Sequence, residues 1–136
     1  MANQFIEDIM SFQFPVITPE TEITEAIEQL QKYDLFGAPV QDKHGALVGF
    51  ISEQQLLAPL LQSSYFCDGA TQVSELMTAE PLSVRKHTTV IDLATQMQQD
   101  KPKIYPVIHA DKVIGIVTRS HVINALRDNY LSCSKH

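Results

Sequence analysis

The spacing of hydrophobic residues along the chain predicts two similar amphipathic helices. In each helix four apolar residues recur at positions i, i+3, i+4 and i+7, which places them on one face. A threonine precedes each helix, Thr21 in the first and Thr88 in the second, and we expect its hydroxyl to cap the helix N-terminus. The apolar positions are Ile23, Ala26, Ile27 and Leu30 in the first helix, and Val90, Leu93, Ala94 and Met97 in the second.

Short apolar segments on either side of these helices predict strands. Residues 15–17 and 82–84 precede the helices and have the length of a short strand. After each helix, two apolar segments separated by a turn predict a β-hairpin, formed by residues 38–51 in one case and 105–117 in the other. The chain therefore carries the order strand, helix, hairpin twice.

A further helix is expected after each hairpin, beginning at Ser52 or Thr118. Ser52 and Gln55 have the spacing of a capping box, which supports the first of these helix starts. Pro59 is expected to kink or shorten that helix. The helix after Thr118 is expected to run longer and to bury one face, and the polar stretch 62–72, with Asp68 and Gly69, is expected to be a linker. The residues predicted for the buried face are Val122, Ile123, Leu126 and Tyr130.

The two halves of the chain are a tandem repeat. A shift of 67 positions superimposes Met10 on Met77 and Ile23 on Val90, and after a one-residue deletion in a turn the shift becomes 66. With that shift, the segment Gly49–Ser52 falls on Gly115–Thr118. Similar residues in the same order over about fifty positions indicate a duplication. We therefore predict one repeat in residues 1–66, including an N-terminal lead-in helix, and a second in residues 67–136.

Composition and charge narrow the class of protein. The chain has 136 residues, of which 44% are hydrophobic and 19% charged, so it can bury the core of one domain or of two small units. A net charge of −6 repels nucleic acid and anionic lipid, and we expect neither a nucleic-acid nor a membrane partner. Two isolated cysteines, Cys67 and Cys133, predict free thiols. With no segment typical of a signal peptide or a membrane span, a cytoplasmic location is expected.

Several segments resemble the CBS (cystathionine β-synthase) domain family, in the tandem arrangement called a Bateman module. The carrying features are the lead-in segments 8–10 and 75–78, the Pro-Val pairs at 39–40 and 106–107, and the junctions Gly49–Ser52 and Gly115–Thr118. The resemblance extends from about Phe5 to Leu126. It implies an α+β fold of two β-α-β-β-α repeats related by a pseudo-two-fold axis, and assembly into homodimers.

The same resemblance implies a function. Such pairs regulate other proteins by holding AMP, ADP, ATP or S-adenosylmethionine in a cleft between the repeats. For this chain it implies a stand-alone regulatory module that signals to a separate, unidentified partner protein. No Gly-rich phosphate loop and no Gly-x-Ser-x-Gly sequence is found, so we expect neither an enzyme nor a bound cofactor. The five histidines at positions 44, 87, 109, 121 and 136 lack metal-site spacing.

The resemblance also implies which residues contact the ligand. A helix N-terminus that follows a glycine-containing junction directs N–H groups at a phosphate. Arg119 would attract that phosphate in the second repeat, whereas Glu53 would repel it in the first, so we expect the principal site in the second repeat. The implied residues are Thr118, Arg119, His121, Val84, Lys103, Ile104, Tyr105 and Pro106 for this site, and Ser52, Gln55, Ile17 and Ala38 for a weaker second cleft.

Structural explanations of the same residues stay open. Where adenosine-binding members of the family carry an acidic residue for the ribose, this chain has Gln55 and His121, which are weaker acceptors. Helix capping alone explains Ser52 and Thr118. The positive turn 85–87 either adds charge near the phosphate or is simply solvated, and Tyr105 and Phe36 are explained by packing. The alternative function is a ligand-independent dimerisation or protein-interaction module.

Overall fold

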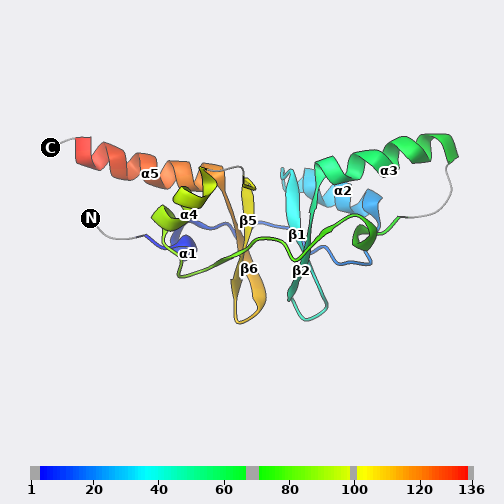
Figure 1. Ribbon diagram of the computed structural model, residues 1–136, viewed down its shortest axis with the longest axis horizontal. Coiled ribbons are helices and arrows are strands. Elements are labelled where there is room, and N and C mark those ends of the chain that lie inside the picture. The colour runs from blue at the N-terminus through cyan, green and yellow to red at the C-terminus, as the bar shows by residue number, and fades with distance from the viewer. Residues whose placement is uncertain (1–3, 67–70, 99–100, 135–136) are drawn as a thin grey trace. The chain divides into compact units, whose positions relative to one another are not determined.

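The computed structural model describes residues 4–66, 71–98 and 101–134, with the side chains of 63–66 and 133–134 left out (Figure 1). The predicted free thiols, and residues Asp68 and Gly69 of the predicted linker, lie outside this description. Helices are found at α1 (Ile6–Ile9), α2 (Ile23–Lys32), α3 (Glu53–Phe66), α4 (Val90–Met97) and α5 (Arg119–Ser134), with a 3-10 turn at Val73–Glu75. Strands are found at β1 (Gly37–Gln41), β2 (Leu47–Ser52), β3 (Thr78–Ala79), β4 (Val84–Arg85), β5 (Ile104–His109) and β6 (Lys112–Thr118).

The first repeat forms a small sheet that is covered by two helices. Its strands are ordered β1-β2-β3, and β1 pairs with β2 in an antiparallel hairpin. Helices α2 and α3 contact each other and enclose an apolar core with the sheet. The predicted inner face of α2 is buried at Ile23, Ala26 and Leu30, because its spacing matches the turn of the helix.

The second repeat has the same hairpin and pair of helices but a different third strand, because β4 precedes its helices whereas β3 follows those of the first repeat. Its sheet has the order β4-β5-β6, and β4 runs parallel to β5 with Val84 opposite Val107. Helices α2 and α4 begin at residues Ile23 and Val90, which the repeat matches. Helices α3 and α5 begin at Glu53 and Arg119, again matched positions. The order predicted from the periodicity is therefore found in both repeats.

The first strand of each repeat is shorter than predicted. Residues 15–17 contribute a single parallel bridge between Ile17 and Val40. In the second repeat the strand lies at Val84–Arg85 rather than at 82–84. Pro15 contributes to the late start in the first repeat, because proline has no N–H to give to a ladder.

The predicted helix caps were wrong in detail. Helix α4 is capped by Thr89, whose hydroxyl accepts a 3.1 Å hydrogen bond from the Asp92 N–H, so the prediction of Thr88 was off by one residue. Helix α2 begins after Glu22 without a side-chain cap. Thr21 instead accepts a 3.0 Å hydrogen bond from the Thr18 N–H. A threonine side chain can stabilise either a helix start or the turn before it, and sequence spacing does not separate the two.

Two predictions about the later helices were also wrong. Helix α3 continues through Pro59 to Phe66, so residues 62–66 are helical rather than linker. On α5 the buried positions are Val122 and Ala125, whereas Ile123 is 55% exposed and Tyr130 is 72% exposed. The buried face is thus rotated from the predicted one, because Leu126 is compatible with either face and Ala125 gives a weak apolar signal.

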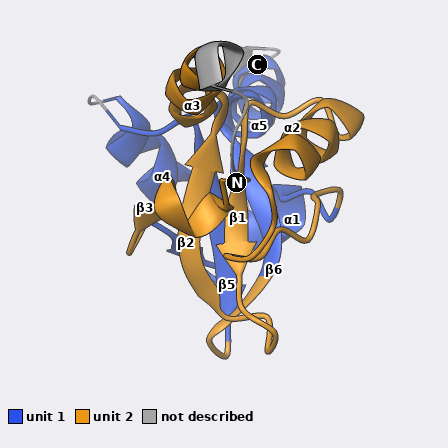
Figure 2. Cartoon of the chain, turned by 90° about the vertical axis from the view of Figure 1, so that its right-hand side faces the viewer, with its two compact units in different colours: residues 1–12, 82–109, 114–136 blue, residues 13–81, 110–113 orange. Residues whose placement is uncertain are grey.

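The two compact units of the chain exchange their lead-in segments (Figure 2). Unit 1 consists of Met1–Phe12, Leu82–His109 and Ile114–His136, and unit 2 of Gln13–Pro81 and Ala110–Val113. The lead-in helix α1 therefore packs with the second repeat, and the lead-in to the second repeat packs with the first. The predicted division at residues 66 and 67 describes the repeat along the chain and stays a prediction.

The exchange is reciprocal at the level of single hydrogen bonds. In unit 1 the Ile6 N–H donates to the Thr88 carbonyl at 2.8 Å, and in unit 2 the Val73 N–H donates to the Thr21 carbonyl, also at 2.8 Å. These two pairs are related by the same 67-residue shift. Each unit therefore uses the same backbone positions to hold a lead-in from the other repeat.

The junction glycines make room for these lead-ins. A Cβ at Gly115 would lie 2.9 Å from both the Met10 Sδ and the Ser11 carbonyl oxygen. A Cβ at Gly49 would lie 2.5 Å from the Met77 Sδ and 3.1 Å from the Thr78 carbonyl oxygen. Real Cβ contacts are longer, so both positions require glycine for close approach of the backbone.

Candidate functional site

The principal candidate site lies where β6 ends and α5 begins in unit 1. The Arg119 N–H donates a 2.9 Å hydrogen bond to the Lys103 carbonyl, which brings the segment before β5 next to the helix start. Lys103 is exposed, and Thr118, Arg119 and His121 are half-buried. The Ser120 N–H, in the first turn of α5, has no partner among the described residues. This helix start thus combines a positive dipole end, two cationic residues and an available N–H donor.

Thr118 and His121 close a capping box on each other. The Thr118 N–H donates to the His121 Nδ1 at 3.1 Å, and the His121 N–H donates to the Thr118 Oγ1 at 3.2 Å. Burial lowers the pKa of His121 from its ordinary value of 6.5, which favours the neutral imidazole that this box requires. The capping role that the sequence left open for Thr118 is therefore observed, and His121 takes part in it, which the spacing had not indicated for this repeat.

Tyr105 is a core residue of unit 1. Its side chain is 1% exposed and belongs to the main apolar cluster of the unit, as packing predicts. Its hydroxyl is buried with no hydrogen-bond partner in the described structure. Burial raises the pKa of Tyr105, and the Arg119 charge opposes this effect. The hydroxyl therefore stays protonated and close enough to the α5 start to feel its charge.

The remaining residues predicted for this site are buried. Ile104 and Pro106 lie in β5, and Val84 lies in β4 within the core cluster. Within the described structure their side chains have little solvent contact, so a ligand would meet this part of the chain through backbone groups.

The positive turn at 85–87 lies at the other end of the sheet. In the parallel ladder Arg85 is opposite Ile108, near the end of β5, whereas Thr118 lies beside its start. The length of β5 is roughly 16 Å at ~3.3 Å per residue. The hypothesis that this turn adds charge near Thr118 is therefore wrong.

The turn instead holds the lead-in helix. Glu7 of α1 lies 3.8 Å from the Lys86 Nζ and 3.4 Å from the His87 Nδ1. The His87 ring also makes edge-to-face contacts with Phe5 and His109. The local sequence pattern does not link Glu7 to this turn, because the residues are about 80 positions apart.

In unit 2 the polar side chains of the weaker candidate cleft are engaged in hydrogen bonds within the protein. The Gln55 Oε1 accepts from the Ser52 N–H at 2.9 Å, as the capping box predicts, and from the Ser52 hydroxyl at 3.3 Å. The Gln55 Nε2 donates to the Thr78 Oγ1 at 2.8 Å, which joins the box to β3 of the exchanged lead-in. Ile17 and Ala38 are fully buried in the core.

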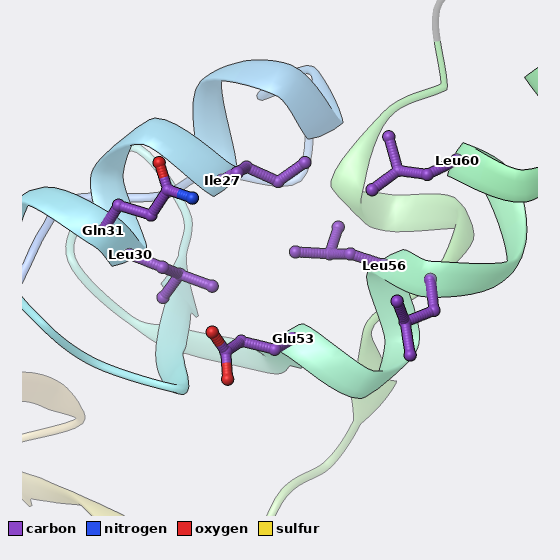
Figure 3. Close-up of a pocket in the computed structure, with 7 residues that line it drawn as sticks. Ile27, Leu30, Gln31, Glu53, Leu56 and Leu60 are labelled. Atoms are coloured by element: carbon purple, nitrogen blue, oxygen red, sulfur yellow. The ribbon is translucent and has the colours of Figure 1, made fainter. Parts of the chain in front are cut away.

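An apolar pocket of about 240 Å³ lies between α2 and α3 of unit 2 (Figure 3). Leu56 and Leu60 of α3 face Ile27 and Leu30 of α2 across it, and the Glu53 carboxylate points into its lower part (Figure 3). The pocket is separate from the predicted cleft, since neither Ser52 nor Gln55 lines it. In the sequence, this pocket is indicated by the leucines of α3, because some of them are exposed and the periodicity of one buried helix face does not explain them.

No group of three or more histidine, cysteine, aspartate or glutamate side chains in the described part of the chain is arranged to hold a metal ion. Among the helices described, none is long and apolar enough to cross a membrane.

Comparison with known protein families gives two matches to the CBS domain, over residues 6–61 and 73–128. The chloroplastic CBS domain-containing protein CBSX1 of Arabidopsis thaliana is 32% identical over 136 aligned positions, covering 81% of this chain and 58% of that protein. The CBS domain-containing protein YhcV of Bacillus subtilis is 26% identical and covers 82% of this chain and 78% of the relative. The chain thus spans somewhat over half of its Arabidopsis relative.

Solved structures give the same result. CBSX2 of Arabidopsis thaliana in complex with AMP has a TM-score of 0.80 and 33% identity, over 93% of this chain and 98% of that one. The CBS domain pair of MJ0100 in complex with 5'-methylthioadenosine and S-adenosyl-L-methionine has a TM-score of 0.76 and 26% identity, over 94% and 99%.

Some of the similar proteins are enzymes. The inosine-5'-monophosphate dehydrogenase of Aquifex aeolicus is 26% identical over 79% of this chain, but the match covers only 21% of the enzyme. Both halves of the chain match the same domain, and the fold is similar to those of the solved relatives. The chain therefore belongs to the CBS domain family and contains two CBS domains in tandem.

Proposed function

We propose that this CBS pair is a non-catalytic regulatory module that binds an adenosine-containing ligand at the start of α5 in unit 1. The observation that carries the proposal is the charge at equivalent helix starts, where Arg119 opens α5 and Glu53 opens α3. A cation at a helix N-terminus adds to the dipole in attracting a phosphate, whereas a carboxylate opposes it. The complexes of CBSX2 with AMP and of MJ0100 with S-adenosylmethionine support the ligand class.

The proposed contacts follow from the accessible groups. Arg119 and Lys103 face the anionic part of the ligand, and the Ser120 N–H and Thr118 hydroxyl offer hydrogen bonds to it. The backbone of residues 104–106 meets the base. Signalling to a separate partner protein, and a cytoplasmic location, are parts of the same proposal.

Thermal melts with about 1 mM AMP, ADP, ATP or S-adenosylmethionine test the proposal. A ligand at 100 times its dissociation constant stabilises the protein by about 2.7 kcal/mol. We expect at least one of the four to raise Tm, and Arg119→Glu to abolish the rise. Arg127→Glu is the matched control, because it reverses the same charge on the same helix, where Arg127 only pairs with Asp128 on the exposed surface.

Two outcomes would contradict the proposal. If none of the four ligands shifts Tm, the chain does not sense this class of molecule. If the shift survives in Arg119→Glu, the ligand binds elsewhere, and Glu53→Arg then tests the corresponding helix start of unit 2.

The second candidate function is a ligand-independent homodimer that docks on a partner. It is favoured by one observation, that Gln55 and His121 are both engaged in capping and neither is a carboxylate able to hold a ribose. Exposed apolar residues on α3, including Leu57 at 58% exposure beside the α2–α3 pocket, suit burial against a second copy. Light scattering should then give a dimer mass that Leu57→Asp reduces to a monomer, while Gln54→Asp, three residues earlier on the same helix and exposed, leaves it unchanged.

A further inference from the structure

The two repeats cap the same helix start with different chemistry. In unit 2 the acceptor for the Ser52 N–H is the amide oxygen of Gln55, at 2.9 Å. In unit 1 the acceptor for the Thr118 N–H is the imidazole Nδ1 of His121, at 3.1 Å. The amide does not titrate in the range where proteins are folded, whereas the imidazole does. Of the two helix starts, only that of α5 therefore has a cap that depends on the protonation state of its side chain.

The hydrogen bond fixes which form of His121 closes the box. Nδ1 can accept from the Thr118 N–H only when it carries no proton, so the neutral ring has its hydrogen on Nε2. Protonation places a second N–H against the Thr118 N–H, and two donors repel each other. The box must then open, which leaves the Thr118 N–H and the imidazolium Nδ1–H without an acceptor.

The charged groups near α5 do not account for the lowered pKa of His121, and burial is its cause. Arg119 and Lys103 lie at the helix start itself, and Tyr105 is neutral. Of the helices packed against α5, α1 carries Glu7 and Asp8 and α4 carries Asp92. Glu7 pairs with Lys86 and His87, the Asp8 carboxylate accepts from the Phe5 N–H, and no carboxylate among the described residues pairs with His121. Burial alone lowers the pKa of His121.

We propose that His121 makes the anion site at the start of α5 dependent on pH. With a neutral ring the box is closed on itself, and with a protonated ring it presents two further donors and a positive charge beside Arg119. An anionic group of the ligand then replaces His121 as the acceptor for the Thr118 N–H. This inference rests on the proposed function, since it concerns the same site.

Proton uptake and anion binding must then favour each other. Because linkage is reciprocal, a bound anion raises the pKa of His121 by the amount that protonation strengthens binding. A shift of one pKa unit corresponds to about a tenfold change in affinity. Because burial lowers the pKa of the ligand-free ring, affinity for the anion is expected to increase as pH falls through and below the ordinary histidine value of about 6.5.

Calorimetric titration with AMP across this pH range tests the inference, with His121→Gln as the matched variant. Glutamine is the residue that the chain itself uses in the equivalent box, so the variant keeps the cap and removes the titration. The second ionisation of a phosphate ester, with pKa near ~6, affects AMP equally in both proteins. We expect the ratio of the Kd of His121→Gln to that of the wild type to rise up to about tenfold as pH falls.

The outcomes separate the two proposals. A ratio that stays constant with pH, with AMP bound by both proteins, overturns the pH dependence and leaves the proposed function standing. Failure of AMP, ADP, ATP and S-adenosylmethionine alike to bind either protein at any pH overturns the proposed function, and with it the role of His121 toward an anion.

Nuclear magnetic resonance of the ligand-free protein tests the box itself. The Thr118 amide resonance is expected to shift with the titration of His121, and to stay constant in His121→Gln. The reverse exchange, Gln55→His, should transfer the same behaviour to the Ser52 amide. A Thr118 amide that does not respond to the His121 titration would overturn the inference without any ligand being present.

Discussion

Several side chains near the candidate site have structural roles, in helix capping or core packing, that their residue types do not indicate. Gln55 and His121 stand where the CBS family resemblance implies a ribose contact, and both instead complete the caps of helices. Tyr105 stands beside the proposed site, and its ring is part of the unit 1 core. A residue near a ligand site therefore has to be tested for its structural role before a binding role is assigned.

The first prediction at this scale concerns pH and stability. The pKa of His121 is lower in the folded than in the unfolded chain, so the unfolded state binds more protons as pH falls through the ordinary histidine value. The free energy of unfolding is therefore expected to fall as pH decreases below about 6.5. In His121→Gln the fall should be smaller, and urea unfolding at about pH 7.5 and 5.5 measures the difference. An equal fall in both proteins would assign it to other groups.

The second residue-scale prediction concerns the Tyr105 hydroxyl. It is buried without a partner, so its removal relieves the cost of an unsatisfied polar group. Tyr105→Phe is expected to leave the free energy of unfolding unchanged or to raise it by up to ~1 kcal/mol. Tyr105→Ala should lower it by ~3–5 kcal/mol, because the ring fills the core. A large loss in Tyr105→Phe would show that the hydroxyl has a partner, and chemical denaturation distinguishes these cases.

At the scale of elements, the contact between each lead-in and the sheet edge depends on a glycine. Met77 packs on Gly49 and Met10 packs on Gly115, at equivalent positions of the two repeats. The family resemblance implies that the Gly-x-x-Ser/Thr junctions bind a phosphate. The structure gives their glycines a second role, since they allow the lead-in to approach the strand closely. Both explanations act on the same residue because the lead-in and the helix start share one strand.

The glycine contacts predict a difference between the repeats. Gly49→Ala would bring a Cβ to 2.5 Å from the flexible Met77 Sδ, so Met77→Ala should relieve part of the strain. Gly115→Ala also meets the Ser11 carbonyl at 2.9 Å, which a side-chain truncation at Met10 cannot relieve. Each glycine substitution is expected to cost ~1–3 kcal/mol. Double-mutant cycles by urea unfolding should show a larger favourable coupling for the Gly49 pair, and equal couplings would contradict the argument.

At the scale of the whole molecule, the exchange of lead-ins makes each unit depend on both ends of the sequence. Residues near the N-terminus complete the core of the second repeat, and residues 71–79 complete that of the first. Neither repeat contains its own full set of core contacts. Loss of one lead-in is therefore expected to destabilise the repeat whose core it completes, which is not the repeat that it introduces along the chain.

Ile6→Ala tests this dependence. Ile6 is 0% exposed and packs in the cluster of unit 1, so its truncation should cost ~2–5 kcal/mol. Hydrogen exchange is expected to accelerate first in α4, β5 and β6 rather than in β1 and β2. Val73→Ala is the matched substitution at the equivalent position, and it should produce the opposite distribution. Acceleration confined to the first repeat in Ile6→Ala would disprove the exchange.

Much of the candidate site was visible in the sequence because it is local. Thr118, Arg119 and His121 are neighbours along the chain, and their placement at a helix start follows from the repeat and the hairpin before it. The nearness of Lys103 also follows, since a hairpin returns to its own beginning. The engagement of the turn 85–87 by Glu7 could not be found in this way, because it depends on the docking of a distant segment.

The sequence by itself determined the duplication, the order of strands and helices, and most of the buried faces of α2 and α4. These features depend on periodicity and turn chemistry within a few residues, which the chain displays directly. Only the tertiary structure decided which lead-in completes which unit, which threonine caps α4, and that His121 accepts the Thr118 N–H. Those outcomes depend on which of several hydrogen-bond partners a group meets and on segments that are distant in sequence. Only the packing of the whole chain decides which partners and segments come together.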